Sequence, residues 1–250
     1  MRIPRIYVDQ PLENHASLTL EGDAAHYLGR VLRLGKDQPL ILFNGDGKDY
    51  PGQITQTSKT RLGVGLGEGA TVGTESPLPV TLAQVISRGD RMDYVIQKSV
   101  EMGVTAIQPL TSERCEVRLN PQREDKRLRH WQQVAVSAAE QCGRAVVPVV
   151  APLRALADWL PSAPGEGLRL VLHHRSHCPL GGMARPEAVT LLIGPEGGLS
   201  DQEIVAAREQ QFQPCTLGPR VMRTETAPVA AVAVIQWLWG DLQPGPNSSD

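Results

Sequence analysis

The spacing of apolar residues changes near residue 80, and this change divides the chain into two parts. In the first part, apolar and polar positions alternate over short stretches bounded by glycine, as they do in strands with one buried face. The pattern predicts strands at residues 6–8, 17–20, 39–43, 52–55 and 61–66. Asn44-Gly45 and Asp46-Gly47 supply the positive-φ positions of a hairpin connection. A small β-barrel-like domain fits these features.

One helix interrupts these strands. Asp23 can cap it, and the helix then carries Ala24, Leu28, Val31 and Leu32 on one face, which we expect to be buried. After the strands, residues 68–79 are rich in glycine and proline and poor in large apolar side chains, which indicates a connection between domains. We assign residues 1–72 to the β-barrel domain and residues 73–79 to the linker.

After residue 80 the pattern is strand–helix alternation. It predicts strands at residues 80–86, 106–110, 168–172, 189–193 and 215–217. It predicts helices at residues 91–102, 123–142 and 200–211, and a closing helix with Pro228 in its first turn. The first of these helices directs Met92, Val95, Ile96, Ser99 and Val100 inward, and Ser200 and Glu203 have the spacing of a capping box. Short, apolar strands are typical of a parallel sheet buried on both faces. Residues 80–242 are therefore predicted to form an α/β domain.

Composition and charge narrow the class of protein. A formal net charge of −2 gives no overall attraction to nucleic acid, so any RNA site must come from local clusters. The four cysteines are far apart, which fits neither a zinc ribbon nor a disulfide framework. No signal-peptide pattern opens the chain, and its most apolar stretch, residues 228–239, is shorter than the roughly 20 residues that span a bilayer. We expect a cytoplasmic protein without membrane contact, and a disordered tail at residues 243–250.

Two loops carry the candidate chemistry, because ligands of open parallel sheets bind beyond the carboxyl ends of the strands. The first reads Gly194-Pro195-Glu196-Gly197-Gly198, and its glycines allow a ligand to approach the backbone closely. The second, after residue 217, interleaves apolar residues with Arg220, Arg223 and Glu225. Taken singly, the first loop could be a plain tight turn, and the second a solvated ion-pair cluster of little energetic value.

Taken together, the two loops resemble those of the SPOUT superfamily of methyltransferases, and within it the RsmE family, which methylates N3 of a uridine in 16S ribosomal RNA. The resemblance extends over nearly the whole chain and includes eight segments in the same order: residues 2–5, 26–33, 42–47, 97–103, 112–115, 138–144, 194–198 and 217–227. The last two are the most specific. Leu199 departs from the family, which often has an aromatic residue at this position.

The resemblance implies features that the periodicity does not. It implies a trefoil knot in the C-terminal α/β domain, a PUA-like N-terminal domain that contacts RNA, a homodimer, and S-adenosyl-L-methionine as cofactor. Carried over residue by residue, the cofactor contacts are Leu172, Gly194, Pro195, Glu196, Gly197, Gly198, Leu217, Gly218, Val221, Met222 and Thr226. The implied RNA partner is 16S ribosomal RNA, free or within the small subunit.

Methylation at N3 of uracil requires removal of the imide proton and stabilisation of the charge left on the flanking carbonyls. Our hypothesis is that Arg223 stabilises the uracilate and that Glu225 orients it or takes the proton. Glu140 and Arg144 are alternates. We expect Glu196 to hold its own loop by accepting backbone hydrogen bonds.

For RNA contact we favour the basic residues of the small domain, Arg2, Arg5, Arg30, Arg33 and Lys36. A second basic run, residues 114–129, also contains Glu124 and Asp125 and fits a solvated face equally well. His173-His174-Arg175-Ser176-His177-Cys178 looks like a metal cluster, but no partner motif completes four ligands, so we expect no metal.

Three questions remain open at the level of sequence. The substrate could be another RNA, such as transfer RNA, or the chain could be a non-catalytic RNA-binding assembly protein. A nicotinamide oxidoreductase is disfavoured because no dinucleotide glycine fingerprint is present. The closing helix is apolar almost all round, which fits either a dimer interface or burial within one subunit.

Overall fold

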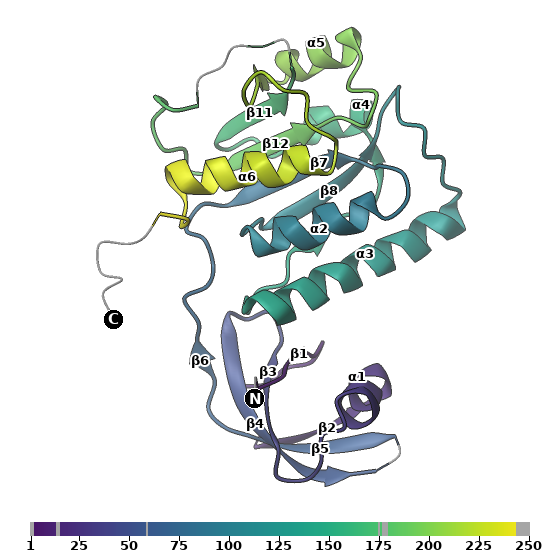
Figure 1. The fold of residues 1–250 in the computed structure, drawn as a ribbon, viewed down its shortest axis with the longest axis vertical. Coiled ribbons are helices and arrows are strands. Elements are labelled where there is room, and N and C mark those ends of the chain that lie inside the picture. Colours follow the sequence, from purple (N-terminus) through teal and green to yellow (C-terminus); the bar gives the residue numbers. More distant parts are fainter. Residues whose placement is uncertain (1–2, 14–15, 59, 175, 177–179, 244–250) are drawn as a thin grey trace. The chain divides into compact units, whose positions relative to one another are not determined.

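The computed structural model describes residues 3–13, 16–58, 60–174, 176 and 180–243, and the chain separates into two compact units. The first contains the residues up to Glu75 together with Ala139–Val147, and the second contains Ser76–Ala138 and the residues from Pro148 onward. The division falls within the long helix α3 (Pro121–Cys142), whose last residues group with the N-terminal unit. Sequence periodicity did not predict this division, because it assigned the whole helix at residues 123–142 to the α/β domain. The helix is drawn in Figure 1.

The N-terminal unit is built on a sheet whose strands lie in the order β1-β3-β4-β5-β2, with β6 paired to β4. The strands are β1 (Arg5–Tyr7), β2 (Ser17–Glu21), β3 (Pro39–Phe43), β4 (Lys48–Thr57), β5 (Arg61–Leu66) and β6 (Ala70–Thr71). Gly45 and Gly47 have φ of 94° and 84°, so the predicted hairpin glycines lie between β3 and β4, which pair antiparallel. β6 falls in the stretch read as a connection.

The helix of this unit differs from the prediction. α1 (Gly22–His26) begins before Asp23 and continues into the π-helical turn η1 (Tyr27–Val31). Leu28 is fully buried, as predicted, but Val31 is 59% exposed and Leu32 is 37% exposed. The prediction of a buried Val31 and Leu32 was wrong because it assumed α-helical spacing, whereas the N–H of Leu32 donates to the carbonyl of Tyr27, five residues back.

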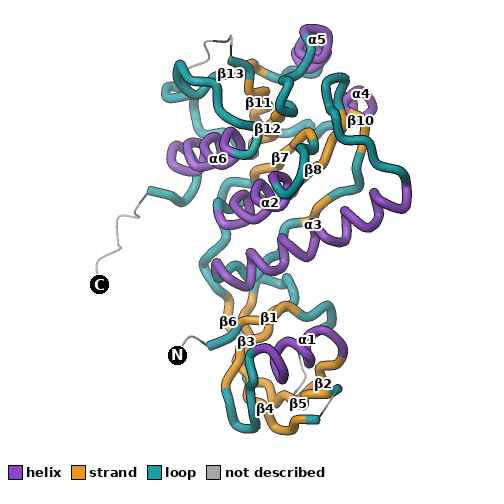
Figure 2. The backbone as a smooth tube through the Cα atoms, turned by 45° about the vertical axis from the view of Figure 1, so that its right-hand side comes forward, coloured by secondary structure: helices purple, strands orange, loops and turns teal. Residues whose placement is uncertain are grey.

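The second unit contains a seven-stranded sheet in the order β10-β8-β7-β12-β11-β13, with β9 paired to β8. Its strands, which can be followed in Figure 2, are β7 (Val80–Val85), β8 (Ala106–Thr111), β9 (Val149–Val150), β10 (Arg154–Ala155), β11 (Leu168–Leu172), β12 (Val189–Ile193) and β13 (Gln213–Cys215). All these pairings are parallel, and every residue of β12 is buried. The predicted parallel α/β sheet is confirmed.

The helices of this unit are α2 (Arg91–Glu101), α3, α4 (Leu156–Trp159), the 3₁₀ turn η2 (Leu160–Ser162), α5 (Asp201–Glu209) and α6 (Thr226–Trp239). α2 and α6 lie side by side on one face of the sheet (Figure 1). Two predictions about helices are confirmed: the five inward residues of α2 are buried, and Ser200 and Glu203 form a reciprocal capping box at α5.

One strand of this unit was misplaced and four short elements were missed. The strand predicted at residues 215–217 is β13, which ends at Cys215. Its partner β11 ends at Leu172, opposite Cys215, so residues 216 and 217 have no strand to pair with. β9, β10 and the short helices α4 and η2 are too brief to give a periodic signal.

Candidate active site

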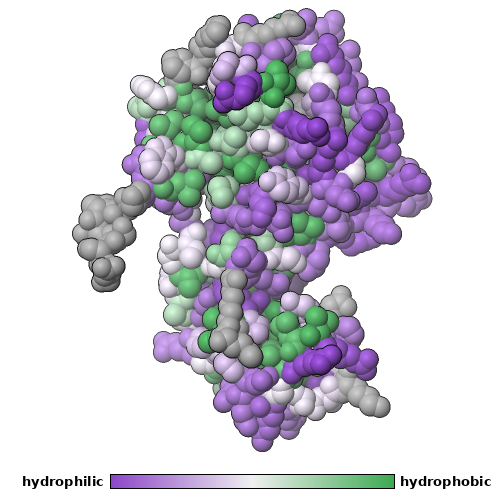
Figure 3. Space-filling view, viewed as in Figure 1, coloured by the Kyte–Doolittle hydropathy of each residue, from purple (hydrophilic) through white to green (hydrophobic). Residues whose placement is uncertain are grey.

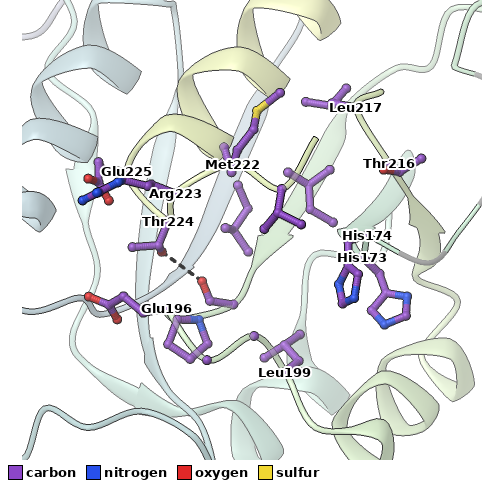
Figure 4. Close-up of a pocket in the computed structure, with 18 of the residues that line it drawn as sticks. His173, His174, Glu196, Leu199, Thr216, Leu217, Met222, Arg223, Thr224 and Glu225 are labelled. Atoms are coloured by element: carbon purple, nitrogen blue, oxygen red, sulfur yellow. Dashed lines mark hydrogen bonds between the residues drawn. The ribbon is translucent and has the colours of Figure 1, made fainter. Parts of the chain in front are cut away.

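The segments that follow β11, β12 and β13 enclose one pocket of about 750 Å³ within the second unit (Figure 4). This volume is in the range of small-molecule sites. The pocket is lined by the glycine loop, defined as Gly194-Pro195-Glu196-Gly197-Gly198, and by the second loop, defined as residues 216–225. In Figure 4, Glu196, Arg223 and Glu225 lie at one end of the pocket, and His173 and His174 lie at the other.

Two glycines of the glycine loop are favoured for different reasons, close packing at Gly194 and a positive φ at Gly198. A Cβ on Gly194 would lie 3.0 Å from the backbone N of Leu199 and 3.2 Å from the carbonyl carbon of Gly198. Gly198 has φ of 68°, a conformation that costs a residue with a Cβ energy, and its N–H donates to the carbonyl of Pro195 at 2.9 Å. The loop is therefore a tight turn that also lines a cavity.

Glu196 is held by its surroundings. Its Oε1 accepts a hydrogen bond from the backbone N–H of Arg88 at 3.2 Å and from the guanidinium of Arg91 at 2.6 Å. Burial acts to raise the pKa of Glu196, but hydrogen bonds from its own backbone N–H and from Arg88, with the charge of Arg91, outweigh burial and hold the pKa below its usual range. Glu196 therefore stays ionised, in agreement with a holding role.

A second arginine braces the same loop. Nη1 of Arg114 donates to the carbonyls of Gly197 and Leu199, each at 3.3 Å. A Cβ on Gly197 would lie 3.4 Å from the Cβ of Arg114, so the two residues are in close contact. The segment after β8 thereby fixes the outer side of the glycine loop.

A chain of two hydrogen bonds connects the second loop to β7 and to the glycine loop. Nε2 of Gln84, in β7, donates to Oγ1 of Thr224 at 3.2 Å, and Oγ1 of Thr224 donates to the carbonyl of Gly194 at 3.0 Å. Gln84 is fully buried and Thr224 is 6% exposed. Thr224, which follows β13, is thus held at the carboxyl ends of β7 and β12.

Arg223 and Glu225 both line the pocket. The carbonyl of Arg223 accepts the N–H groups of Thr226 and Ala227 at 3.0 Å and so begins α6. Nε of Arg91 lies 3.8 Å from Oε1 of Glu225, an ion pair but not a hydrogen bond. Oε2 of Glu225 is shielded from solvent and accepts no hydrogen bond in the described part of the chain.

All of the residues predicted to contact a cofactor line this pocket except Gly218 and Thr226. Thr226 is the first residue of α6, and the carbonyl of Gly218 accepts a hydrogen bond from the Thr216 side chain. Sequence reasoning missed Arg91, Arg114 and Thr224. The first two follow β7, which pairs with β12, and β8, which pairs with β7, so the rule that ligands gather at carboxyl ends of parallel strands could have found them.

The alternates Glu140 and Arg144 do not line the pocket; both belong to the N-terminal unit. Oε1 of Glu140 accepts the backbone N–H of Tyr7 at 3.0 Å, and Nη2 of Arg144 lies 2.6 Å from Oε2 of Glu75. Arg144 is only 3% exposed. Their contacts are structural.

Arg5 does not fit the predicted RNA contact. Its side chain is 9% exposed and makes two hydrogen bonds to Asp49, at 2.6 and 3.0 Å. Its guanidinium also donates to the carbonyl of Ala139 and stacks 4.6 Å from the centre of the Phe43 ring. A guanidinium with these partners has no donor directed at a phosphate.

The other predicted RNA residues are Arg30, Arg33 and Lys36, which are exposed, and Arg2, which lies outside the described residues. Among the described residues, no group of three or more His, Cys, Asp or Glu side chains could hold a metal ion. Arg175, His177 and Cys178 lie outside the described residues, as does the predicted tail from residue 244. In the described chain no helix has the length and apolar character needed to cross a membrane.

Comparison with known families defines the class of the protein. Residues 74–236 match the family model of the RNA methyltransferase domain, and residues 20–64 match that of the RNA methyltransferase PUA domain. The α/β unit with its pocket is therefore the methyltransferase domain of an RNA methyltransferase, and the N-terminal unit contains its PUA domain.

Similar proteins narrow the class further. The chain is 34% identical to the ribosomal RNA small subunit methyltransferase E of Buchnera aphidicola, over 96% of this chain and 98% of the relative. The enzyme of that name from Neisseria gonorrhoeae, solved bound to S-adenosyl methionine, is 42% identical, with a TM-score of 0.91 over 97% of this chain and all of the other. A Legionella pneumophila protein, solved with the same cofactor, is 39% identical with a TM-score of 0.93 and equal coverage. The chain belongs to the ribosomal RNA small subunit methyltransferase E family.

Proposed function

We propose that this protein transfers the methyl group of S-adenosyl-L-methionine to N3 of a specific uridine in the 16S ribosomal RNA of the small ribosomal subunit. The observation that carries the proposal is the pocket, in which an apolar portion and a glycine turn adjoin Arg223 and Glu225. Two of the relatives named above were solved with this cofactor bound, and two are named as ribosomal RNA small subunit methyltransferases. Its place of action would be the cytoplasm, where small ribosomal subunits are.

The residues of the pocket fit the cofactor. Its apolar lining includes Leu172, Ile193, Leu199, Leu217 and Met222, which suit an adenine ring. The glycine loop exposes backbone to the cavity, and any Cβ at Gly194 would disturb it. The glycine loop would hold the methyl donor by backbone contacts, as the family resemblance implies.

When bound, S-adenosyl-L-methionine supplies an electrophilic methyl group on a sulfonium. Arg223, which makes no ion pair in the described part of the chain, would donate hydrogen bonds to the carbonyl oxygens that flank N3. The N3–H bond would break as its proton passes to Glu225, and the N3 electron pair would form the new bond to the methyl carbon. The bond from that carbon to sulfur would break in the same step, with its electron pair going to sulfur, so that neutral S-adenosylhomocysteine would be the leaving group. Oε2 of Glu225 accepts no hydrogen bond in the described chain. It would therefore be available to accept the proton of the uracil N3–H group.

The substrate is tested by nucleoside mass spectrometry of ribosomal RNA from cells with and without this gene. We expect one N3-methyluridine to disappear from 16S RNA. Purified protein incubated with small subunits, naked ribosomal RNA and transfer RNA locates the preferred substrate in the same experiment. Methylation of transfer RNA alone would contradict the proposal, and a chain that binds no S-adenosylhomocysteine by calorimetry would be an assembly protein instead.

The proposed roles predict how two variants behave. Arg223→Ala should abolish turnover while leaving the Kd for S-adenosylhomocysteine nearly unchanged, because its role is to stabilise charge that develops on the base. Glu225→Gln should lower kcat by roughly 10²–10⁴-fold, the usual contribution of a general base. Arg208→Ala, an exposed position on α5, is the control. Full activity in Arg223→Ala would remove Arg223 from the mechanism.

We further propose that the second unit is a trefoil knot. β13 is the edge strand beside β11, yet Thr224, nine residues after β13, bonds to Gln84 in β7 and to Gly194 after β12. The chain must therefore return across the carboxyl ends of β11 and β12 before α6 begins. Threading of this return through the preceding loops is the arrangement that the family resemblance implies, and it is an exception to the usual avoidance of knots.

A homodimer is the working unit that we propose. Figure 3 shows hydrophobic side chains gathered over α6. Val234 and Trp237 on this helix are 36% and 52% exposed, and Leu242 just after it is 40% exposed. A contiguous apolar face of this kind is typical of a protein interface, and a second copy of the chain would cover it.

A further inference from the structure

The π-helical turn of the N-terminal unit leaves apolar side chains in solvent. Tyr27 is 43% exposed, Val31 is 59% exposed and Leu32 is 37% exposed. Because the N–H of Leu32 donates to the carbonyl of Tyr27 at 2.9 Å, Val31 and Leu32 come one turn after Tyr27 and share its face. We call these three residues the Tyr27 face. Leu28 alone anchors the turn, with no exposed surface.

Positive charge surrounds the Tyr27 face. Arg30, Arg33 and Lys36 are exposed, and none of them has an ion pair or a side-chain hydrogen bond within the described residues. Asp37 is the one carboxylate among residues 26–37. Figure 3 shows hydrophobic and strongly hydrophilic atoms next to one another over this part of the N-terminal unit. The surface thus combines an aromatic ring with cations that have no protein partner.

The backbone at this surface is also strained. Arg33 has φ of 56°, a left-handed conformation that costs a residue with a Cβ about 1–2 kcal/mol. Residues held in such a conformation cluster at functional sites. Here the retained side chain is a guanidinium directed to solvent.

We infer that the Tyr27 face binds an unpaired stretch of RNA, with one nucleobase stacked on Tyr27 and the neighbouring phosphates on Arg30, Arg33 and Lys36; the inference rests on the proposed RNA substrate. A bare apolar face would fit another protein, but the unpartnered cations fit a polyanion. Base faces are accessible only in unpaired RNA, since in a duplex they are stacked on one another. The bound RNA is therefore single-stranded where it meets this unit.

The experiment measures binding of the full chain to a labelled ten-residue oligouridine and to an RNA duplex of equal length, by fluorescence anisotropy. Wild type should prefer the oligouridine. Tyr27→Ala should weaken its binding roughly fivefold to hundredfold, the range found for one base–aromatic stack, and Tyr27→Phe should restore it. Tyr94→Ala is the matched control, because Tyr94 on α2 is also exposed, at 47%, but belongs to the other unit.

Charge and folding are checked with two further variants. Arg30→Gln should reduce the slope of log K against log salt by about 0.7, the value for one phosphate contact to a single strand. Arg33→Gly should weaken RNA binding without lowering Tm, because glycine removes the strain at φ 56°. The salt slope of Arg30→Gln reports a lost phosphate contact, and the Tm of Arg33→Gly shows whether weaker RNA binding comes from unfolding.

Three results would overturn the inference. The wild-type protein could bind the oligouridine no more tightly than the duplex, or Tyr27→Ala could bind the oligouridine as tightly as wild type does. In the third result, Tyr27→Ala would change its oligomeric state while its RNA affinity stays the same. The last would make the Tyr27 face a protein interface. Calorimetry with S-adenosylhomocysteine on the same samples separates this outcome from failure of the proposed function. A chain that binds the cofactor product and methylates RNA, but is indifferent to Tyr27, contradicts only the present inference.

Discussion

Arg91 lies between two carboxylates that come from different loops of the pocket. Its guanidinium donates to Glu196 at 2.6 Å and lies 3.8 Å from Glu225. It therefore holds the glycine loop and faces the residue that we propose as proton acceptor. With 38% of its side chain exposed, solvent screens these interactions and limits what they contribute.

Arg91→Ala should raise the Kd for S-adenosylhomocysteine about fivefold, the equivalent of roughly 1 kcal/mol for a partly exposed charged contact. It should also lower kcat, because Glu225 loses the cation that faces it. Arg91→Lys should recover part of the affinity. Arg88→Ala is the control: that side chain pairs with Glu116 at the surface, and only its backbone contacts Glu196. Wild-type values of Kd and kcat in Arg91→Ala would contradict a positioning role.

At the scale of single residues, sequence reasoning reached some side chains and not others. Arg223 and Glu225 were found because they follow the last strand of a parallel sheet, and this position alone brings them to the pocket. Arg91 was missed because its partner Glu196 is 105 positions away in the chain. Arg5 was misread because exposure cannot be read from residue type, and Asp49 neutralises it.

Among the elements, the second loop depends on one hydroxyl for its connection to the sheet. Thr224 accepts from Gln84 in a buried bond and donates to Gly194 in a partly buried one. Replacement by valine keeps the shape but leaves the Gly194 carbonyl without this donor. An unsatisfied buried polar group costs about 1–3 kcal/mol.

Thr224→Val should therefore lower the free energy of unfolding by about 1–3 kcal/mol and weaken binding of S-adenosylhomocysteine, since the two loops that form the pocket are no longer joined. Thr224→Ser retains the hydroxyl and should restore both quantities. Denaturant titration and calorimetry on the same samples provide the measurements. Thr105→Val is the control, because its hydroxyl also donates to a backbone carbonyl, that of Val80, but Thr105 does not line the pocket. Equal stability of Thr224→Val and Thr224→Ser would exclude the hydroxyl as the connecting group.

The end of α3 contains a carboxylate whose ionisation opposes folding. Burial raises the pKa of Glu140, and the N–H of Tyr7 and the charge of Arg5 offset this only in part. A carboxyl with a raised pKa in the folded state binds its proton more tightly there than in the unfolded chain. The stability that it contributes is complete at low pH and is lost as pH rises through the raised pKa.

Glu140→Gln keeps an oxygen that can accept the N–H of Tyr7 but cannot ionise. Its Tm should match wild type at pH values below the ordinary carboxyl pKa and exceed it, by about 1–3 °C, near neutral pH. Differential scanning fluorimetry across pH 4–8 measures the difference. The exposed Glu209→Gln should show no such pH dependence. A Tm advantage that grows toward acid pH would contradict the assigned direction.

Predictability of the elements follows the length and regularity of each pattern. α2 has three turns with one buried stripe, and its five inward residues were predicted correctly. The turn at Tyr27–Val31 was not, because a π-helical turn has a different period and moves Val31 and Leu32 to the surface. β6, β9 and β10 have two residues each and no period at all.

At the scale of the whole molecule, the exposed apolar face of α6 is the surface to which we assign a second subunit. Its buried side packs on the sheet with α2, while Val234 and Trp237 face outward. Stable interfaces bury upwards of about 1,000 Å² and depend on a few large residues, of which tryptophan is the most frequent. Trp237 is therefore the residue on which a dimer through this face should depend.

Wild-type protein should have twice the 27.1 kDa mass of one chain by light scattering at micromolar concentration. Trp237→Lys should have the mass of one chain and keep its fold, because the substituted side chain is 52% exposed and a lysine there remains solvated. Val205→Lys is the matched control, since Val205 is 54% exposed on α5. If Trp237→Lys stays dimeric, another face joins the subunits. If wild type has the mass of one chain, the exposed apolar face of α6 has a different partner, and activity should then survive Trp237→Lys unless that partner is the substrate.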